Sequence, residues 1–255
     1  IYSLKDKVWT RVTDNGLAQT EGWWTSIKSA DLDGDGDQDL VAGNWGLNSK
    51  FKASKSEPIT LYRYDFDENG TIDPLVTYYH KGVETPFASK DELSKQLPFL
   101  NKKFRTYKSF AQSPLEGLFD KAMLNTAEKK KVYELASCVF INTGDGQFIK
   151  QQLPGMAQVA PIFDVEIFDF DKDGNPDLFP VGNLFQISTQ LGRLDGLNGL
   201  LLQGQGNGEF TWWSEATAPL SGACRQIKSV KLGDRNTFVI VRNNATPVFL
   251  TQAPQ

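Results

Sequence analysis

The feature that most constrains the fold is a nine-residue acidic pattern that occurs three times. The copies are residues 31–39 (DLDGDGDQD), 65–73 (DFDENGTID) and 169–177 (DFDKDGNPD). Each copy has an oxygen-bearing side chain at positions 1, 3, 5 and 9 and a glycine at position 6, which permits a sharp backbone turn. Alternate side chains of such a curled loop point inward, and carboxylates this close repel one another unless a cation lies between them. The pattern therefore predicts three cation-binding loops.

Calcium is the cation that these loops favour, because it takes six to eight hard oxygen ligands in a flexible shell. Magnesium demands stricter octahedral geometry, and zinc and copper prefer His or Cys, whereas His80 is the only histidine. We expect about three sites, with position 7 offering its backbone carbonyl. The candidate ligand residues are Asp31, Asp33, Asp35, Asp37 and Asp39; Asp65, Asp67, Asn69, Thr71 and Asp73; and Asp169, Asp171, Asp173, Asn175 and Asp177. The alternative is an Asp/Gly-rich turn without metal.

The residues on either side of each loop are typical of strands, not of an EF-hand. An EF-hand needs a bidentate Glu at position 12, where these loops have Ala42, Val76 and Pro180. Apolar residues follow position 9, and residues 27–30 and 165–168 alternate with period two before the first and third loops. We expect each loop to join two strands, so that the cation holds a hairpin together.

A longer repeat indicates the architecture. A Gly-Asx-Gly-x-Phe unit follows an apolar run in residues 139–148 and again in 200–210, and residues 227–236 repeat the apolar pattern without the carboxylates, as a degenerate copy that we expect to hold no metal. Units of about 60 residues with four short strands are typical of β-propeller blades. We predict an all-β fold: one β-propeller domain over residues 1–255, or a segment of one. Its four blades are residues 1–58, 59–138, 139–198 and 199–255, with a helical insertion at 86–136 in the second.

The first loop, followed by Leu40-Val41-Ala42-Gly43, resembles the FG-GAP/VCBS repeat of integrin-type β-propellers. With Asn44-Trp45-Gly46-Leu47-Asn48, the chain is also similar to bacterial surface proteins of the UnbV and cartilage-acidic-protein-like group. The resemblance implies that the matching carboxylates bind calcium structurally. The departures, Asn69 and Asn175, both retain an oxygen. Propellers of this type have more than four blades, so we expect the chain to belong to a longer protein.

Composition argues against several classes of function. The formal net charge is −4, which disfavours nucleic acid as a partner, although residues 50–131 carry 15 basic and 11 acidic side chains. No apolar run approaches the length of a transmembrane helix. Cys138 and Cys224 are too few for a disulfide scaffold, and we interpret them as small buried side chains, with a single disulfide as the open alternative.

No catalytic constellation stands out. His80 is the only histidine, and the spacing of the carboxylates outside the loops does not indicate a glycosidase pair; these are Asp164, Glu166, Asp195 and Glu215. Adjacent tryptophans place one ring outward if they lie on a strand, as in Trp23-Trp24 and Trp212-Trp213. The candidate ligand-contacting rings are Trp23, Trp24 and Trp45. Packing inside a blade is their alternative role.

We therefore expect a noncatalytic binding or assembly module that recognises a protein or glycan partner. We expect it outside the cytoplasm (secreted, periplasmic or at the cell surface), because calcium sites of extracellular modules are too weak, with Kd values of roughly 10⁻⁴–10⁻³ M, to fill in the cytosol. The alternative is a calcium-dependent, lyase-like enzyme acting on polysaccharides. Its base would come from the cluster Tyr78, Tyr79, His80 and Lys81.

Overall fold

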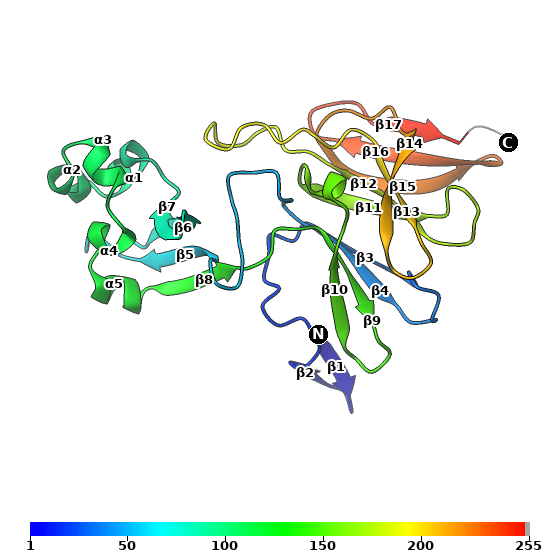
Figure 1. The fold of residues 1–255 in the computed structure, drawn as a ribbon, viewed down its shortest axis with the longest axis horizontal. Coiled ribbons are helices and arrows are strands. Elements are labelled where there is room, and N and C mark those ends of the chain that lie inside the picture. Colours follow the sequence, from blue (N-terminus) through cyan, green and yellow to red (C-terminus); the bar gives the residue numbers. More distant parts are fainter. Residues whose placement is uncertain (253–255) are drawn as a thin grey trace. The chain divides into compact units, whose positions relative to one another are not determined.

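The computed structural model describes residues 1–252, which form two compact units (Figure 1). The first unit contains Ile1–Ala18, Gly22–Lys50 and the described chain from Leu135 onward, and the second contains Gln19–Glu21 and Phe51–Glu134. The first contains several small antiparallel sheets and the second contains one, and no sheet in the described chain closes on itself. The predicted all-β class is confirmed at this level. None of the described helices is long and apolar enough to cross a membrane.

Two four-stranded meanders dominate the first unit. The first contains β3 (Ser26–Ala30), β4 (Asp39–Gly43), β9 (Cys138–Asn142) and β10 (Phe148–Gln152) in that spatial order. A short 3-10 helix, Gly155–Gln158, leads to the second, which contains β11 (Ile162–Phe168), β12 (Asp177–Gly182), β13 (Leu200–Gly204) and β14 (Phe210–Thr217). The Gly-Asx-Gly-x-Phe units form the hairpin turns between β9 and β10 and between β13 and β14. The two meanders are therefore built alike.

Two further sheets complete the first unit. A three-stranded meander contains β15 (Cys224–Leu232), β16 (Arg235–Arg242) and β17 (Val248–Thr251). A separate hairpin near the N-terminus contains β1 (Tyr2–Lys5) and β2 (Val8–Arg11).

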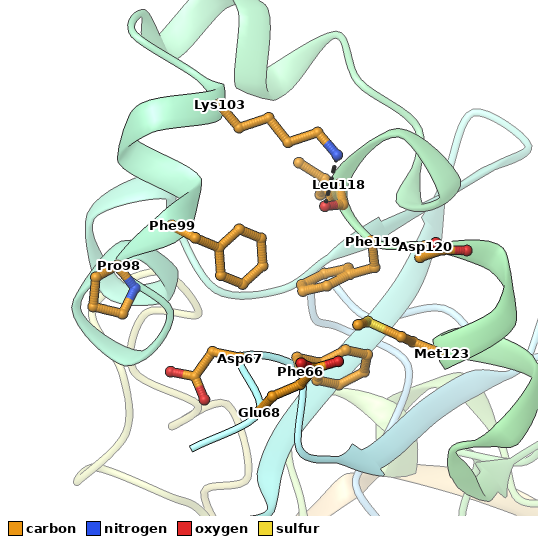
Figure 2. Close-up of a pocket in the computed structure, with 10 residues that line it drawn as sticks. All are labelled: Phe66, Asp67, Glu68, Pro98, Phe99, Lys103, Leu118, Phe119, Asp120 and Met123. Carbon is orange, nitrogen blue, oxygen red and sulfur yellow. Dashed lines mark hydrogen bonds between the residues drawn. The ribbon is translucent and has the colours of Figure 1, made fainter.

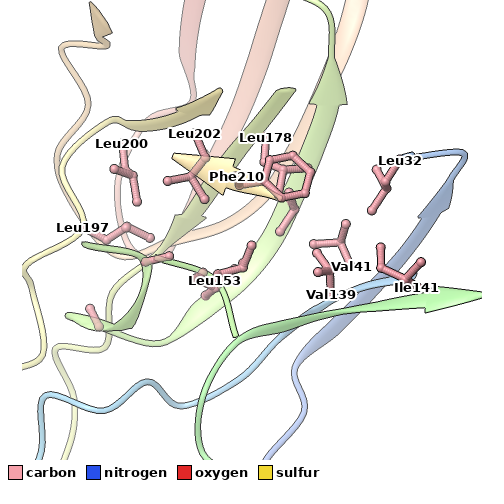
Figure 3. Close-up of a cluster of buried hydrophobic side chains, with 14 of the residues drawn as sticks. Leu32, Val41, Val139, Ile141, Leu153, Leu178, Leu197, Leu200, Leu202 and Phe210 are labelled. Atoms are coloured by element: carbon pink, nitrogen blue, oxygen red, sulfur yellow. The ribbon is translucent and has the colours of Figure 1, made fainter. Parts of the chain in front are cut away.

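The meanders pack face to face, and the period-two pattern of their strands explains how. On β12, Leu178 contributes to a core shared with the first meander, while its neighbour Phe179 contributes to a core shared with the third. Leu202 and Leu201 on β13 divide in the same way. The core between the first two meanders is labelled in Figure 3: Leu32, Val41, Val139, Ile141, Leu153, Leu178, Leu197, Leu200, Leu202 and Phe210. The second meander is thus covered on both faces.

Buried carboxylates on β11 bind it to the first strands of the other two meanders. The Asp164 carboxylate accepts a hydrogen bond from the backbone N–H of Ile227 on β15 (3.0 Å). It also forms an ion pair with Lys28 Nζ on β3 (3.1 Å). Glu166 accepts a hydrogen bond from the backbone N–H of Ser229, also on β15 (3.0 Å). The first strands of three successive sheets therefore lie next to one another.

The second unit has its own sheet, with helices packed on it. The sheet contains, in spatial order, β7 (Val83–Pro86), β6 (Asp73–His80), β5 (Ile59–Tyr64) and β8 (Glu128–Val132). Five short helices separate β7 from β8: α1 (Lys90–Gln96), α2 (Phe99–Lys103), α3 (Tyr107–Ala111), α4 (Leu115–Leu118) and α5 (Lys121–Thr126). Ser89 caps α1 in a capping box with Glu92, as the sequence pattern predicts. The helices fall inside the predicted helical segment 86–136.

The sheets divide the chain differently from the predicted blade limits. The predicted third blade, 139–198, contains strands of two sheets, because β9 pairs with β4 and β12 pairs with β13. Residues 51–134 interrupt the first meander between β4 and β9 and fold as a unit of their own. The length of a sequence repeat predicts how many strands recur in each unit, but it does not predict which strand begins each sheet. Cys138 and Cys224 are free and buried, as the first interpretation held.

Candidate metal centres

Each acidic loop connects two antiparallel strands, as predicted. The loops join β3 to β4, β5 to β6 and β11 to β12. In every loop the carboxylates of positions 1, 3 and 9 converge, with one potential ligand atom from each lying within 4.8 Å of the others. The three groups are Asp31, Asp33 and Asp39; Asp65, Asp67 and Asp73; and Asp169, Asp171 and Asp177. Residues 1–252 therefore contain three acidic clusters that could hold a metal ion.

The carboxylate at position 1 shapes the loop by accepting backbone N–H groups. One of its oxygens accepts from the glycine at position 6 in all three loops, at 3.0 Å in the first, 2.7 Å in the second and 3.1 Å in the third. These glycines are Gly36, Gly70 and Gly174, with φ of +95°, +87° and +91°. A residue with a Cβ is disfavoured there, so the glycine expected at position 6 is required by the backbone.

The carboxylate at position 9 is the most buried of each cluster. Asp39 and Asp177 are fully buried and Asp73 is 6% exposed. Their Oδ2 atoms accept the backbone N–H of loop position 2, from Leu32, Phe66 and Phe170 at 2.8, 3.0 and 2.9 Å.

The second oxygen of position 9 reaches beyond the loop. Asp39 Oδ1 accepts from the backbone N–H of Asn142 at the end of β9 (2.7 Å), and Asp177 Oδ1 from that of Gly204 at the end of β13 (2.8 Å). In the second loop the donor is the Gln96 side chain of α1, at 3.3 Å. Sequence reasoning missed these three partners; the available signal was the place of Asn142 and Gly204 next to the Gly-Asx-Gly turns, and Gln96 on α1 had no such signal.

Position 5 behaves differently from the other predicted ligands. Its side chains are exposed in all three loops, and each accepts the backbone N–H of position 7 at 2.8 Å; the residues are Asp35, Asn69 and Asp173. This hydrogen bond lowers the pKa of the Asp173 carboxyl. The structure therefore groups the carboxylates of positions 1, 3 and 9, and the carboxylates of Asp35, Asp37 and Asp173 are not members of these groups.

Carboxylate oxygens without a hydrogen-bond donor and raised carboxyl pKa values characterise the centres in the described part of the chain. Asp67 Oδ1 and Asp169 Oδ1 are buried and have no hydrogen-bond donor among the described residues, and a buried polar atom without a partner is costly. Burial raises the pKa of the Asp33 carboxyl, and the charges of Asp39, Asp35 and Asp31 raise it further. Burial likewise raises the pKa of Asp177. The arrangement fits a cation held by oxygen ligands alone.

The degenerate copy is a tight turn. Leu232 pairs with Arg235 across a two-residue connection, Gly233-Asp234, that joins β15 to β16. A two-residue connection has no room for the nine-residue loop, and Asp234 is its single carboxylate.

The tryptophans proposed as ligand contacts lie outside the strands. The Trp23 and Trp45 rings meet edge to face, with centroids 5.1 Å apart, and Trp45 Nε1 donates to Ser49 Oγ at 3.1 Å. Trp24 packs against Phe140 instead, at 5.7 Å. All three are half-buried. On β14 the Trp212 ring is exposed and Trp213 packs on a core, in the alternation expected for a strand.

The groups considered for catalysis differ in their exposure to solvent. Tyr78 is buried against Phe51 and Phe87, whereas His80 is exposed at the end of β6. Burial, and then the charges of Glu84 and Glu57, raise the pKa of Tyr79, which disfavours the phenolate that a base would need.

The carboxylates outside the loops have structural roles or lie at the surface. Asp164 and Glu166 hold strands together, as described above. Asp195 forms an exposed ion pair with Arg193 (3.4 Å), and Glu215 is exposed on β14.

Comparison with known proteins adds no further information. No family model, no curated protein and no solved structure matches the chain.

Proposed function

We propose that the three loops bind calcium and that calcium holds the hairpins in place. The single observation that supports this most strongly is the repeated convergence of positions 1, 3 and 9, with buried carboxylate oxygens that lack a donor in two of the three loops. All the converging ligand atoms are hard oxygens, which suit calcium better than zinc or copper. Asp31, Asp33 and Asp39 and their equivalents would hold the ion, whose charge offsets their repulsion.

We also propose that the first unit is a segment of a β-propeller. Its three meanders stack face to face, and the first strands β3, β11 and β15 lie next to one another through Lys28, Asp164 and Ile227. Propeller blades are four-stranded meanders placed around an axis lined by such strands. The resemblance of the first loop to FG-GAP/VCBS repeats supports the same proposal, and the first two meanders each begin at the strand before an acidic loop.

The role that follows is a noncatalytic module for binding or assembly outside the cytoplasm, with a protein or glycan as partner. Two features support it. The acidic clusters maintain loop geometry through backbone hydrogen bonds, and the groups considered for catalysis are buried in packing, bonded between strands or exposed at the surface. The half-buried pair Trp23 and Trp45 is the proposed partner contact, because aromatic rings stack on sugars and anchor protein partners.

Thermal unfolding with and without calcium tests the proposal. A ligand that binds only the folded state stabilises it by RT ln(1 + [L]/Kd), or about 2.7 kcal/mol per site at a hundredfold excess over Kd. We expect the melting temperature in millimolar calcium to exceed that in chelator by several degrees, with magnesium giving less. Equal melting temperatures in chelator and in calcium would overturn the calcium assignment.

A further inference from the structure

The second unit contains a cavity of about 560 Å³ that the proposed function does not use (Figure 2). Pockets of this size hold small organic ligands. Three phenylalanine rings line it, with ring centroids 4.5 Å apart for Phe66 and Phe119 and 6.4 Å apart for Phe99 and Phe119. Met123 and Leu118 add to its apolar wall. Such a wall favours a ligand with an aromatic or alkyl body.

One side of this cavity is the second acidic loop itself. Phe66, Asp67 and Glu68, loop positions 2 to 4, all line it (Figure 2). The backbone N–H of Phe66 donates to Asp73 Oδ2 (3.0 Å), and Asp67 Oδ1 is a buried oxygen without a donor. Both Asp67 and Asp73 belong to the cluster that could hold a metal. A cation in this loop would therefore fix the wall against which a ligand packs.

The net charge of the cavity wall determines whether a cationic or an anionic ligand is favoured. The loop has four carboxylates, Asp65, Asp67, Glu68 and Asp73, so with one divalent cation its charge is −4 + 2 = −2. The remaining charged groups at the cavity, Lys103 and Asp120, offset each other. Lys103 Nζ donates to the Leu118 carbonyl (3.3 Å) and lies over the Phe104 ring. An organic cation is favoured by the carboxylates and by the faces of the aromatic rings.

We propose that this cavity binds an organic cation with an aromatic or alkyl body, and that calcium in the second loop controls the binding. The calcium dependence rests on the proposed function. The site is distinct from the tryptophan pair, because it is built from the second loop and the helices of residues 90–126.

Two fluorescent probes that share a dansyl group test the proposal: dansylcadaverine, which carries an ammonium, and dansylglycine, which carries a carboxylate. With the whole chain in calcium, we expect saturable fluorescence enhancement with dansylcadaverine and weaker binding of dansylglycine. In chelator the dansylcadaverine signal should fall, because the loop no longer holds the cavity wall in place, and this loss exceeds the added attraction of a loop whose charge is then −4. Glu68→Gln, at an exposed residue, should weaken dansylcadaverine by about two- to fivefold and leave dansylglycine unchanged or bound more tightly.

The three loops provide a matched pair of variants. Asp65→Asn alters position 1 of the second loop, which is not among the cavity-lining residues, and Asp169→Asn makes the same change in the third loop. Only Asp65→Asn should abolish the calcium dependence of dansylcadaverine binding. Any one of three results would overturn the proposal. Dansylcadaverine would bind equally well in calcium and in chelator, or Asp65→Asn and Asp169→Asn would reduce its binding equally, or dansylglycine would bind as tightly as dansylcadaverine.

A calcium titration of the same samples separates the two hypotheses. Three bound calcium ions without dansylcadaverine binding would overturn this inference and leave the proposed function standing. No bound calcium would overturn the proposed function and the calcium control of this cavity together. Circular dichroism in chelator checks that the loop variants fold, and both should give the same spectrum as the parent. Glu68→Gln tests the preference for a cationic ligand without altering a metal-ligating position.

Discussion

At the level of single residues, the three loops repeat one set of hydrogen bonds. Position 1 accepts from the position 6 glycine, position 9 from position 2, and position 5 from position 7. The same donors recur although the residues at positions 4, 5 and 7 differ between loops. In the first loop these hydrogen bonds bring the carboxylates of Asp31, Asp33 and Asp39 together. Without a cation between them, the three carboxylates repel one another.

Asp33→Asn should have opposite effects with and without calcium. The amide oxygen can still accept the Asp35 backbone N–H (3.3 Å in the parent), but the charge is lost. In calcium the variant should lose up to about 2.7 kcal/mol of stability at a hundredfold excess over Kd, because one site is weakened. In chelator it should melt no lower than the parent, since repulsion is relieved. Thermal unfolding under both conditions measures this, and Asp195→Asn, at an exposed residue outside the loops, is the control. Equal destabilisation in both conditions would contradict a calcium role for Asp33.

The sequence predicts the centres because their spacing is a local property. Carboxylates at positions 1, 3 and 9 around a position 6 glycine are visible without knowledge of the fold, and all three loops are hairpins as expected. Position 5 is predicted to be a ligand, and its side chain also accepts the position 7 N–H, as Asp35 does for Asp37. A carboxylate can accept a backbone N–H and bind a cation at the same time, as proposed for positions 1 and 9, so spacing alone does not establish the ligand role of position 5.

At the level of secondary structure, position 9 connects each loop of the first unit to the third strand of its sheet. Asp177 bonds both Phe170 within the loop and Gly204 at the end of β13. The hairpins can be predicted from the period-two alternation of the sequence, but the contact between position 9 and the third strand cannot. It depends on strand pairing over long sequence separations, which reaches 103 residues between Asp39 and Asn142.

Asp177→Asn should therefore destabilise the protein with or without calcium. The amide presents a donor where Asp177 accepts two backbone N–H groups, so one of them loses its partner in a fully buried position. The expected cost is about 1–3 kcal/mol in urea unfolding, even in chelator. Asp173→Asn removes the same charge from an exposed position of the same loop and should have little effect in chelator. A variant Asp177→Asn as stable as Asp173→Asn in chelator would argue against the structural role of position 9.

At the level of the whole molecule, the repeat predicts stacked four-stranded units but not their limits. Residues 51–134 leave the first meander after β4 and the chain returns to it at β9. In the sequence, only the helical part of this segment (residues 86–136) can be recognised as an insertion. The strands β5, β6 and β7 alternate like the strands of the first unit and are not recognisable as part of a separate unit. Its separate core of helices and aromatic rings is a tertiary property.

Asp164 should be important for the stability of the first unit. It joins three sheets, since it lies on β11 and contacts Lys28 on β3 and the Ile227 N–H on β15. Asp164→Ala leaves a buried N–H without an acceptor and should cost about 2–4 kcal/mol in urea unfolding. Asp195→Ala, at an exposed carboxylate, is the matched control and should be close to the parent. Similar stabilities for both variants would contradict the stacking role of Asp164.

Calcium titration of the chelator-stripped protein tests the central claim most directly. The parent should bind three calcium ions per chain, and Asp33→Asn, Asp67→Asn and Asp171→Asn should each weaken a single site, because each removes one charge from a different cluster. The triple variant should bind none in the same concentration range. Absence of calcium binding by the parent at millimolar concentration, or unchanged binding by the triple variant, would contradict the account.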